Sequence, residues 1–139
     1  MSRTYIPVAL RRLVSERANG RCEYCLVGQA YSLVLHHPDH IIAEQHGGQT
    51  ISENLAGACI ECNYRKGPNI ASVDPITNQI VPLFNPRLNH WQEHFRLEGA
   101  HIRALTPIGR ATLQLLQFND TLRLDVRQAM LEDNDLLVP

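Results

Sequence analysis

Two pairs of cysteines with the same spacing constrain this chain of 139 residues more than any other feature. The pairs are Cys22 with Cys25 and Cys59 with Cys62. Four thiolates supplied by two such turns are the usual ligands of a tetrahedral structural Zn²⁺. A redox dithiol and four unrelated thiols are the alternatives, but neither explains two equal spacings. We therefore expect a zinc site whose four coordination positions are all filled by protein, with none open to substrate.

Charge gives the chain no overall attraction for polyanions. Lys and Arg number 13 against 14 Asp and Glu, for a net charge of -1. Any nucleic-acid surface must therefore be a local basic patch. Candidates for such a patch are Arg11, Arg12, Arg17 and Arg21.

The chain also lacks the patterns of membrane and secreted proteins. No apolar run approaches the roughly 20 residues that span a bilayer, and residues 1–7 lack the apolar core of a secretory signal. We expect a cytoplasmic protein with no membrane partner, in which the cysteines stay reduced.

Periodicity and turn residues predict an alternation of short elements. We expect helices over 7–19, 58–66, 90–95, 106–119 and 120–131. We expect a strand over 31–35 that ends at the polar segment 36–40. We also expect a hairpin around Gly47 and Gly48, and a second turn over 74–78 between short extended pieces. Trp91 and Phe95 are spaced to share a core stripe, and the acidic segment 132–135 is expected to fray.

The long segment between the cysteine pairs contains a group suited to hydrolytic chemistry. Asp39 and Asn63 offer carboxylate and amide oxygens, which suit a hard cation such as Mg²⁺ or Mn²⁺. His40 follows Asp39 and points to the opposite side of an extended segment, so it could deprotonate a water without binding the metal. This division of labour is what phosphodiester hydrolysis with one metal ion needs.

Taken together, these motifs resemble the zinc-stapled HNH endonucleases. The resemblance rests on Cys22-Glu-Tyr-Cys25, Asp39-His40-Ile41-Ile42, Gly47-Gly48-x-Thr50, Asn54-Leu55 and Cys59-Ile-Glu-Cys62-Asn63-x-x-Lys66-Gly67. It covers residues 22–67, and later segments between 69 and 107 resemble a bacterial subgroup of small stand-alone members.

The resemblance implies an α+β fold with a ββα-metal core stapled by the four-cysteine zinc site. Helices at both ends would flank this core. We expect a single nuclease domain over residues 1–139, with the core at 20–70, a helix at about 7–19 and a C-terminal elaboration at about 80–131.

The resemblance also assigns roles to individual residues. His40 is the general base and Asn54, the middle residue of the motif, orients the loop and the base. Asp39 and Asn63 take the metal-ligand positions, with Asn63 where many members have a histidine. The cation is expected to be Mg²⁺ or Mn²⁺, with Ni²⁺ as a further candidate, and the products to carry 5′-phosphate and 3′-hydroxyl ends.

Four further residues are candidates for contacting phosphate or for supporting the metal ligands from behind, although ordinary surface roles suit them too. They are His37, His46, Arg65 and Lys66. The expected partner is nucleic acid, DNA in particular, and a homodimer would supply two active sites for cutting both strands. The alternatives are a zinc-stapled nucleic-acid-binding module without activity and a zinc-ribbon adaptor, which would leave Asp39 and His40 unexplained.

Overall fold

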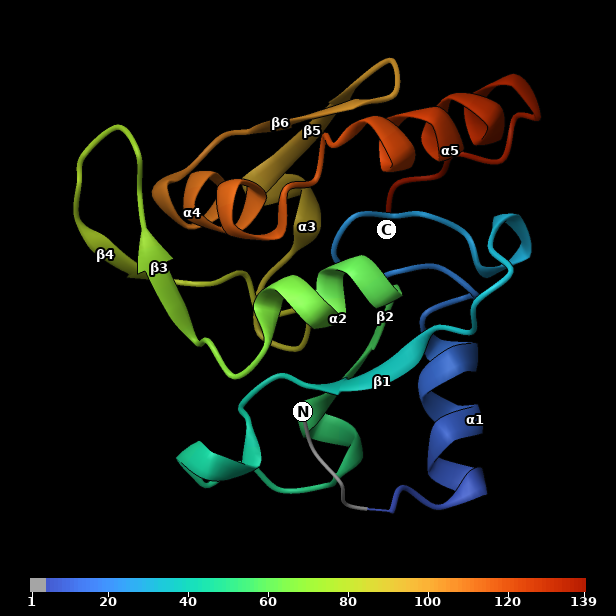
Figure 1. Ribbon diagram of the computed structural model, residues 1–139, viewed down its shortest axis with the longest axis vertical. Coiled ribbons are helices and arrows are strands. Elements are labelled where there is room, and N and C mark those ends of the chain that lie inside the picture. Colours follow the sequence, from blue (N-terminus) through green and yellow to red (C-terminus); the bar gives the residue numbers. More distant parts are fainter. Residues whose placement is uncertain (1–4) are drawn as a thin grey trace.

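The computed structural model describes residues 5–139, so most of the segment examined for a secretory signal, residues 1–4, lies outside it. Short helices and strands alternate in an α+β arrangement (Figure 1). The helices are α1 (Val8–Arg17), α2 (Ile60–Lys66), α3 (Trp91–His94), α4 (Pro107–Leu116) and α5 (Thr121–Glu132). The strands are β1 (His37–His40), β2 (Leu55–Ala58), β3 (Ala71–Val73), β4 (Ile80–Pro82), β5 (Phe95–Glu98) and β6 (His101–Ala104).

A hairpin followed by a helix forms the centre of the molecule. β1 pairs antiparallel with β2, with Asp39 opposite Ala56, and α2 follows β2 and packs back on β1. The predicted hairpin around Gly47 and Gly48 is confirmed, since both glycines lie in the connection between these strands. The strand predicted over 31–35 is wrong, because β1 is the polar segment that was expected to end it.

The physical reason for this error is that the apolar run is not buried. Leu33 and Leu35 are fully or largely exposed in a bend before β1. β1 is instead selected by its pairing with the buried strand β2, whose four residues lie in the interior. Long-range pairing has therefore overridden local β propensity.

Helix α1 packs against the outer side of the hairpin. Its Val14 forms a small apolar cluster with Ile6 and with Leu55 of β2. Pro7 precedes the first helical residue, and the helix ends before Gly20, as the sequence predicts. Figure 1 shows α1 beside one end of β1, on the opposite side of the hairpin from α4 and α5.

The C-terminal half adds two hairpins and three helices. Helices α3, α4 and α5 were all predicted, and the side chain of Thr106 caps α4 by accepting from the backbone N–H of Gly109 at 3.0 Å. The turn predicted over 74–78 joins β3 to β4. The hairpin of β5 and β6 was not predicted, although its residues alternate in burial around a two-residue turn with Gly99 at φ +58°.

One main core joins the HNH-like centre to the C-terminal half. The aromatic rings of Trp91, Phe95 and Phe118 pack in series at tilted angles, with centroids 5.1 and 5.3 Å apart, and the predicted pairing of Trp91 with Phe95 is confirmed. This ring series belongs to the same buried cluster as the four cysteines. The cysteines therefore sit where the two halves of the molecule meet.

The acidic segment after α5 does not fray. The carboxylate of Asp135 pairs with Arg21 at 2.8 Å, and that of Asp133 accepts a hydrogen bond from the Tyr31 hydroxyl at 2.8 Å. The prediction of a loose end is therefore wrong, because these carboxylates find partners more than a hundred positions earlier. Among residues 5–139, no helix combines the length and apolar character needed to cross a bilayer.

Candidate functional site

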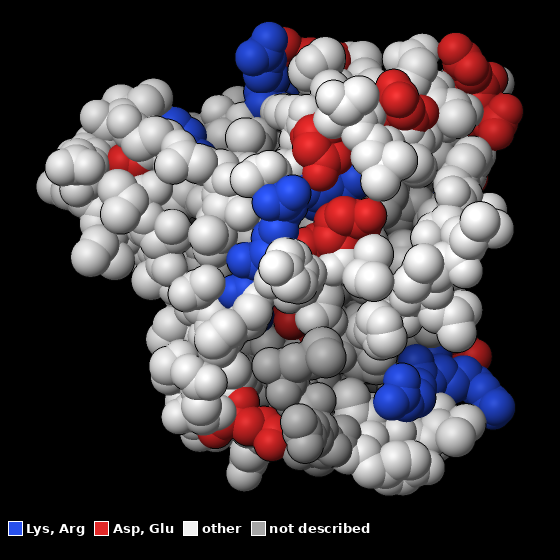
Figure 2. All heavy atoms as spheres, in the orientation of Figure 1, with Lys and Arg blue, Asp and Glu red and all other residues white. Residues whose placement is uncertain are grey.

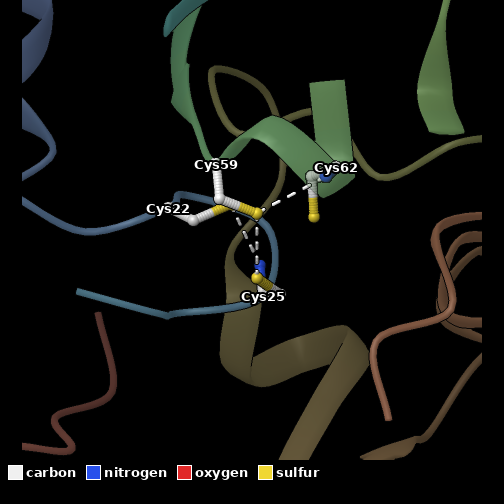
Figure 3. A group of neighbouring side chains, drawn as sticks. All are labelled: Cys22, Cys25, Cys59 and Cys62. Atoms are coloured by element: carbon white, nitrogen blue, oxygen red, sulfur yellow. Dashed lines mark hydrogen bonds between the residues drawn. The ribbon is translucent and has the colours of Figure 1, made fainter. Parts of the chain in front are cut away.

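The four cysteines form a closed, buried cluster. Their Sγ atoms all lie within 4.8 Å of one another, and all four residues are buried. Figure 3 shows two coming from the turn before β1 and two from the junction of β2 and α2, with the sulfurs converging. We call the turns Cys22–Cys25 and Cys59–Cys62 the first and second knuckle.

The donor set of this cluster fits zinc. Four thiol sulfurs arranged around one point are the ligands of structural Zn²⁺, and no position is left for water. Backbone N–H groups of Cys25 and Cys62 point to the sulfurs of Cys22 and Cys59, each at 3.4 Å. Hydrogen bonds from the other thiols outweigh burial at Cys25 and bring its pKa well below the usual value, while hydrogen bonds and burial raise the pKa of Cys59 and Cys62. The chain is therefore arranged to hold a structural zinc ion.

Two buried arginines of α5 support the knuckles, a feature that sequence reasoning missed. Arg123 donates to the Sγ of Cys62 at 3.1 Å and also binds Asp120 and backbone carbonyls at the end of α4. Arg127 donates to the carbonyl of Cys25 at 3.2 Å and to that of Ala100 at 2.7 Å. Four thiolates around one Zn²⁺ leave an excess of negative charge, which these guanidinium groups would offset.

Asp39 and His40 occupy the last two positions of β1, and their side chains contact different residues. Both are nearly buried, with 5% and 8% of their surface exposed. His40 Nε2 lies 2.9 Å from the hydroxyl of Thr50 and 3.5 Å from the carboxylate of Glu44, both in the loop between the strands. Its Nδ1 has no hydrogen-bond partner within residues 5–139.

The Asp39 carboxylate is held through one of its oxygens. Oδ2 accepts from the hydroxyl of Tyr24 at 2.9 Å and lies 3.2 Å from the ammonium of Lys66. Oδ1 accepts no hydrogen bond from the described part of the chain. Burial raises the pKa of Asp39, and the Lys66 ammonium and Tyr24 hydroxyl partly offset that rise.

Asn54 braces the loop that carries the partners of His40. Its amide donates to the carbonyls of Ile42 and Gln49 and accepts from the N–H of Ile42, all at 2.9 Å. Gly48 lies against this brace, since a Cβ there would come within 1.7 Å of the Ile42 carbonyl oxygen. The amide of Asn54 thus fixes the loop without reaching the reacting atoms.

Asn63 lies on α2, one residue after the second knuckle. It is half-buried, and its side-chain amide makes no hydrogen bond with residues 5–139. Because α2 packs on β1, this amide stays a candidate ligand beside Asp39. The oxygen donors of Asp39 and Asn63 fit a hard divalent cation.

The four supporting candidates occupy different positions. Lys66 is buried, and its ammonium binds both Asp39 and the carbonyl of His40, the latter at 2.9 Å, so it supports the site from behind. Arg65 is half-buried on the same helix. His37 is exposed at the far end of β1, and His46 is exposed in a turn of the loop between the strands.

A groove beside α1 gathers positive charge. It has a volume of about 300 Å³ and its lining, from α1 to the start of β1, holds no acidic residue. Among the lining residues are Arg11, Arg12, Arg21, His36 and His37, and the charge of Arg21 is paired with the Asp135 carboxylate at 2.8 Å. Figure 2 shows basic side chains gathered over α1 and a second basic group near α2. The fourth arginine of the predicted patch turns away, since Arg17 donates to the carbonyl of Leu55 at 2.7 Å.

Comparison with protein families gives the class to which this geometry belongs. Residues 22–69, which span both knuckles, β1, β2 and α2, match the family model described as HNH endonuclease. This segment of the chain is therefore an HNH domain, and the resemblance seen in its motifs is confirmed. No curated protein and no solved structure gives a significant match.

Proposed function

We propose that this protein is a metal-dependent HNH endonuclease that hydrolyses phosphodiester bonds in DNA. His40 is its general base, and Asp39 and Asn63 hold the catalytic cation. An HNH domain indicates nuclease chemistry in general. The observation that carries the finer proposal is the contrast between two neighbours on β1, since Asp39 keeps Oδ1 available while His40 keeps Nδ1 available.

We place the His40 proton on Nε2, because the Glu44 carboxylate near that nitrogen can only accept a hydrogen bond. An imidazole that donates from Nε2 to the Thr50 hydroxyl keeps the lone pair on Nδ1, which can take a proton from the attacking water. The Glu44 carboxylate, 3.5 Å from Nε2, stabilises the imidazolium that results. Asn54 holds the loop so that these partners stay in place. Mg²⁺ or Mn²⁺, when bound, polarises the scissile phosphate and neutralises charge on the leaving oxygen.

The α1 groove offers a surface for the phosphate backbone. His37 lines the groove and His40 lies three residues further along β1, roughly 10 Å away in an extended strand. A nucleic-acid strand that passes from the groove along β1 could contact Arg11 and Arg12 and reach His40. Reduced thiols that hold zinc suit a reducing compartment, so we place the enzyme in the cytoplasm.

The proposal is tested by cleavage of supercoiled plasmid DNA in Mg²⁺, Mn²⁺, Ni²⁺ or EDTA, with bound zinc assayed in each sample. We expect cutting that requires added cation, zinc that stays constant, and products with 5′-phosphate ends. A rise in double-strand breaks relative to nicks with protein concentration would indicate that a second copy cuts the other strand. Binding of DNA without cutting under any cation would favour the non-catalytic binding module instead.

A further inference from the structure

Tyr24 lies between two zinc ligands and reaches the other metal site. It is the residue before Cys25 in the first knuckle, and only 1% of its surface is exposed. Its carbonyl accepts from the indole N–H of Trp91 at 2.9 Å, and its ring packs edge-on against Phe84 with centroids 6.4 Å apart. Both ends of this residue are fixed, so its hydroxyl has a defined position.

That hydroxyl and the ammonium of Lys66 meet at a single oxygen atom. Tyr24 donates to Asp39 Oδ2 at 2.9 Å, and Lys66 Nζ lies 3.2 Å from the same atom. Lys66 comes from α2, which begins in the second knuckle. The first knuckle and the helix that begins in the second therefore each supply one buried donor to Oδ2, and Oδ1 is the oxygen left for a further ligand.

We propose that Tyr24 is a positioning residue for the catalytic cation, and that its hydroxyl makes the affinity of the cation site depend on the geometry of the first zinc knuckle. This inference rests on the proposed function, because it needs Asp39 to be a cation ligand. Donors that orient a metal-binding carboxylate commonly change metal affinity by about 10- to 100-fold when removed. Tyr24 touches neither the cation nor the substrate.

The test compares Tyr24→Phe with Tyr31→Phe in the zinc-loaded protein. Both substitutions remove one hydroxyl that donates to a carboxylate, but Tyr31 binds Asp133, far along the chain from Asp39. Mn²⁺ binding is measured by calorimetry without nucleic acid, and the Mn²⁺ dependence of plasmid cleavage is measured separately. Zinc content and thermal unfolding are recorded for each protein.

We expect Tyr24→Phe to weaken Mn²⁺ binding about 10-fold and to raise the half-saturating Mn²⁺ concentration equally. Its cleavage rate at saturating Mn²⁺ should stay within about threefold of wild type, and Tyr31→Phe should change neither quantity. Unchanged Mn²⁺ affinity in Tyr24→Phe would overturn the inference. So would loss of zinc or of folded protein, because the hydroxyl would then serve folding.

The outcome also separates this inference from the proposed function. If wild type cuts DNA with added cation and Tyr24→Phe binds Mn²⁺ as tightly as wild type does, the proposed nuclease function is supported and the positioning role of Tyr24 is wrong. If wild type binds no Mn²⁺ and cuts no DNA, both the proposed function and the positioning role are wrong.

Discussion

The zinc centre and the Asp39–His40 site lie in one HNH segment, yet the polar atoms of the two sites have opposite surroundings. In the zinc centre all four sulfurs converge and none faces solvent. In the other site Asp39 Oδ1 and His40 Nδ1 have no hydrogen-bond partner among residues 5–139. Among residues 5–139, neither atom belongs to the fully buried side-chain atoms without a partner, so both reach the surface, where a ligand from outside can approach them.

The two sites also draw support from different parts of the chain. Asp39 and His40 are held by residues of the HNH segment itself, namely Tyr24, Thr50, Asn54 and Lys66. The knuckles are held by Arg123 and Arg127 of α5, outside the segment that matches the family. The C-terminal half thus supports the two knuckles, while Asp39 and His40 find their side-chain partners within the HNH segment.

Loss of a zinc ligand should have the largest effect. Cys62→Ser removes a thiolate from the main core, and structural zinc contributes roughly 10 kcal/mol or more to the folding of small zinc domains. We expect a protein without bound zinc and without a cooperative thermal transition, measured by metal analysis and circular dichroism. A variant that keeps one zinc per chain and melts as wild type does would show that the fourth sulfur is dispensable.

Removal of the guanidinium beside the zinc centre should have the next largest effect. Arg123→Gln leaves Cys62 and the carbonyls at the end of α4 without their buried donor, which should lower the free energy of unfolding by about 3 kcal/mol. Zinc transfer to a chromogenic chelator should become faster. The matched control is Arg96→Gln, where a largely exposed arginine pairs with Glu98 and the free energy of unfolding should hardly change.

Equal chelator kinetics in Arg123→Gln and Arg96→Gln would contradict the role given to α5. The zinc centre would then be supported by its own two knuckles, and the C-terminal half would contribute only to the core.

A change in the loop between β1 and β2 should reduce cleavage without removing zinc. Gly48→Ala places a Cβ 1.7 Å from the Ile42 carbonyl oxygen, so the loop braced by Asn54 must shift, and we expect cleavage to fall roughly 10- to 100-fold. Gly47→Ala is the control, because its Cβ meets nothing within 4 Å and only its φ of +88° is strained, by about 1 kcal/mol. Similar activities for the two variants would argue against a packed loop.

The sequence was informative wherever the site is made of local patterns. Two equal cysteine spacings, an Asp-His pair and a glycine pair are contiguous features, and the structure places them in a zinc cluster, a strand end and a loop. Helix α4 followed from its capping threonine and proline for the same reason. These are patterns in which neighbouring residues set the geometry.

The rest depends on contacts between distant residues. Nothing near Arg123 in the sequence indicates that it lies against Cys62, 61 positions earlier. The strand expected over 31–35 was wrong because burial of β2, not apolar character, selects its partner. The missed hairpin of β5 and β6 did carry a signal, since apolar and charged residues alternate on both sides of Gly99.

The most direct test of the separation between the two sites is plasmid cleavage by His40→Ala, with bound zinc measured in the same preparation. His40 makes no hydrogen bond to a cysteine, so the variant should keep one zinc per chain and a cooperative thermal transition, lowered only by the cavity that the lost ring leaves. Cleavage should fall at least about 100-fold, as expected for loss of a general base. Wild-type cleavage by this variant, or its loss together with zinc, would contradict the account.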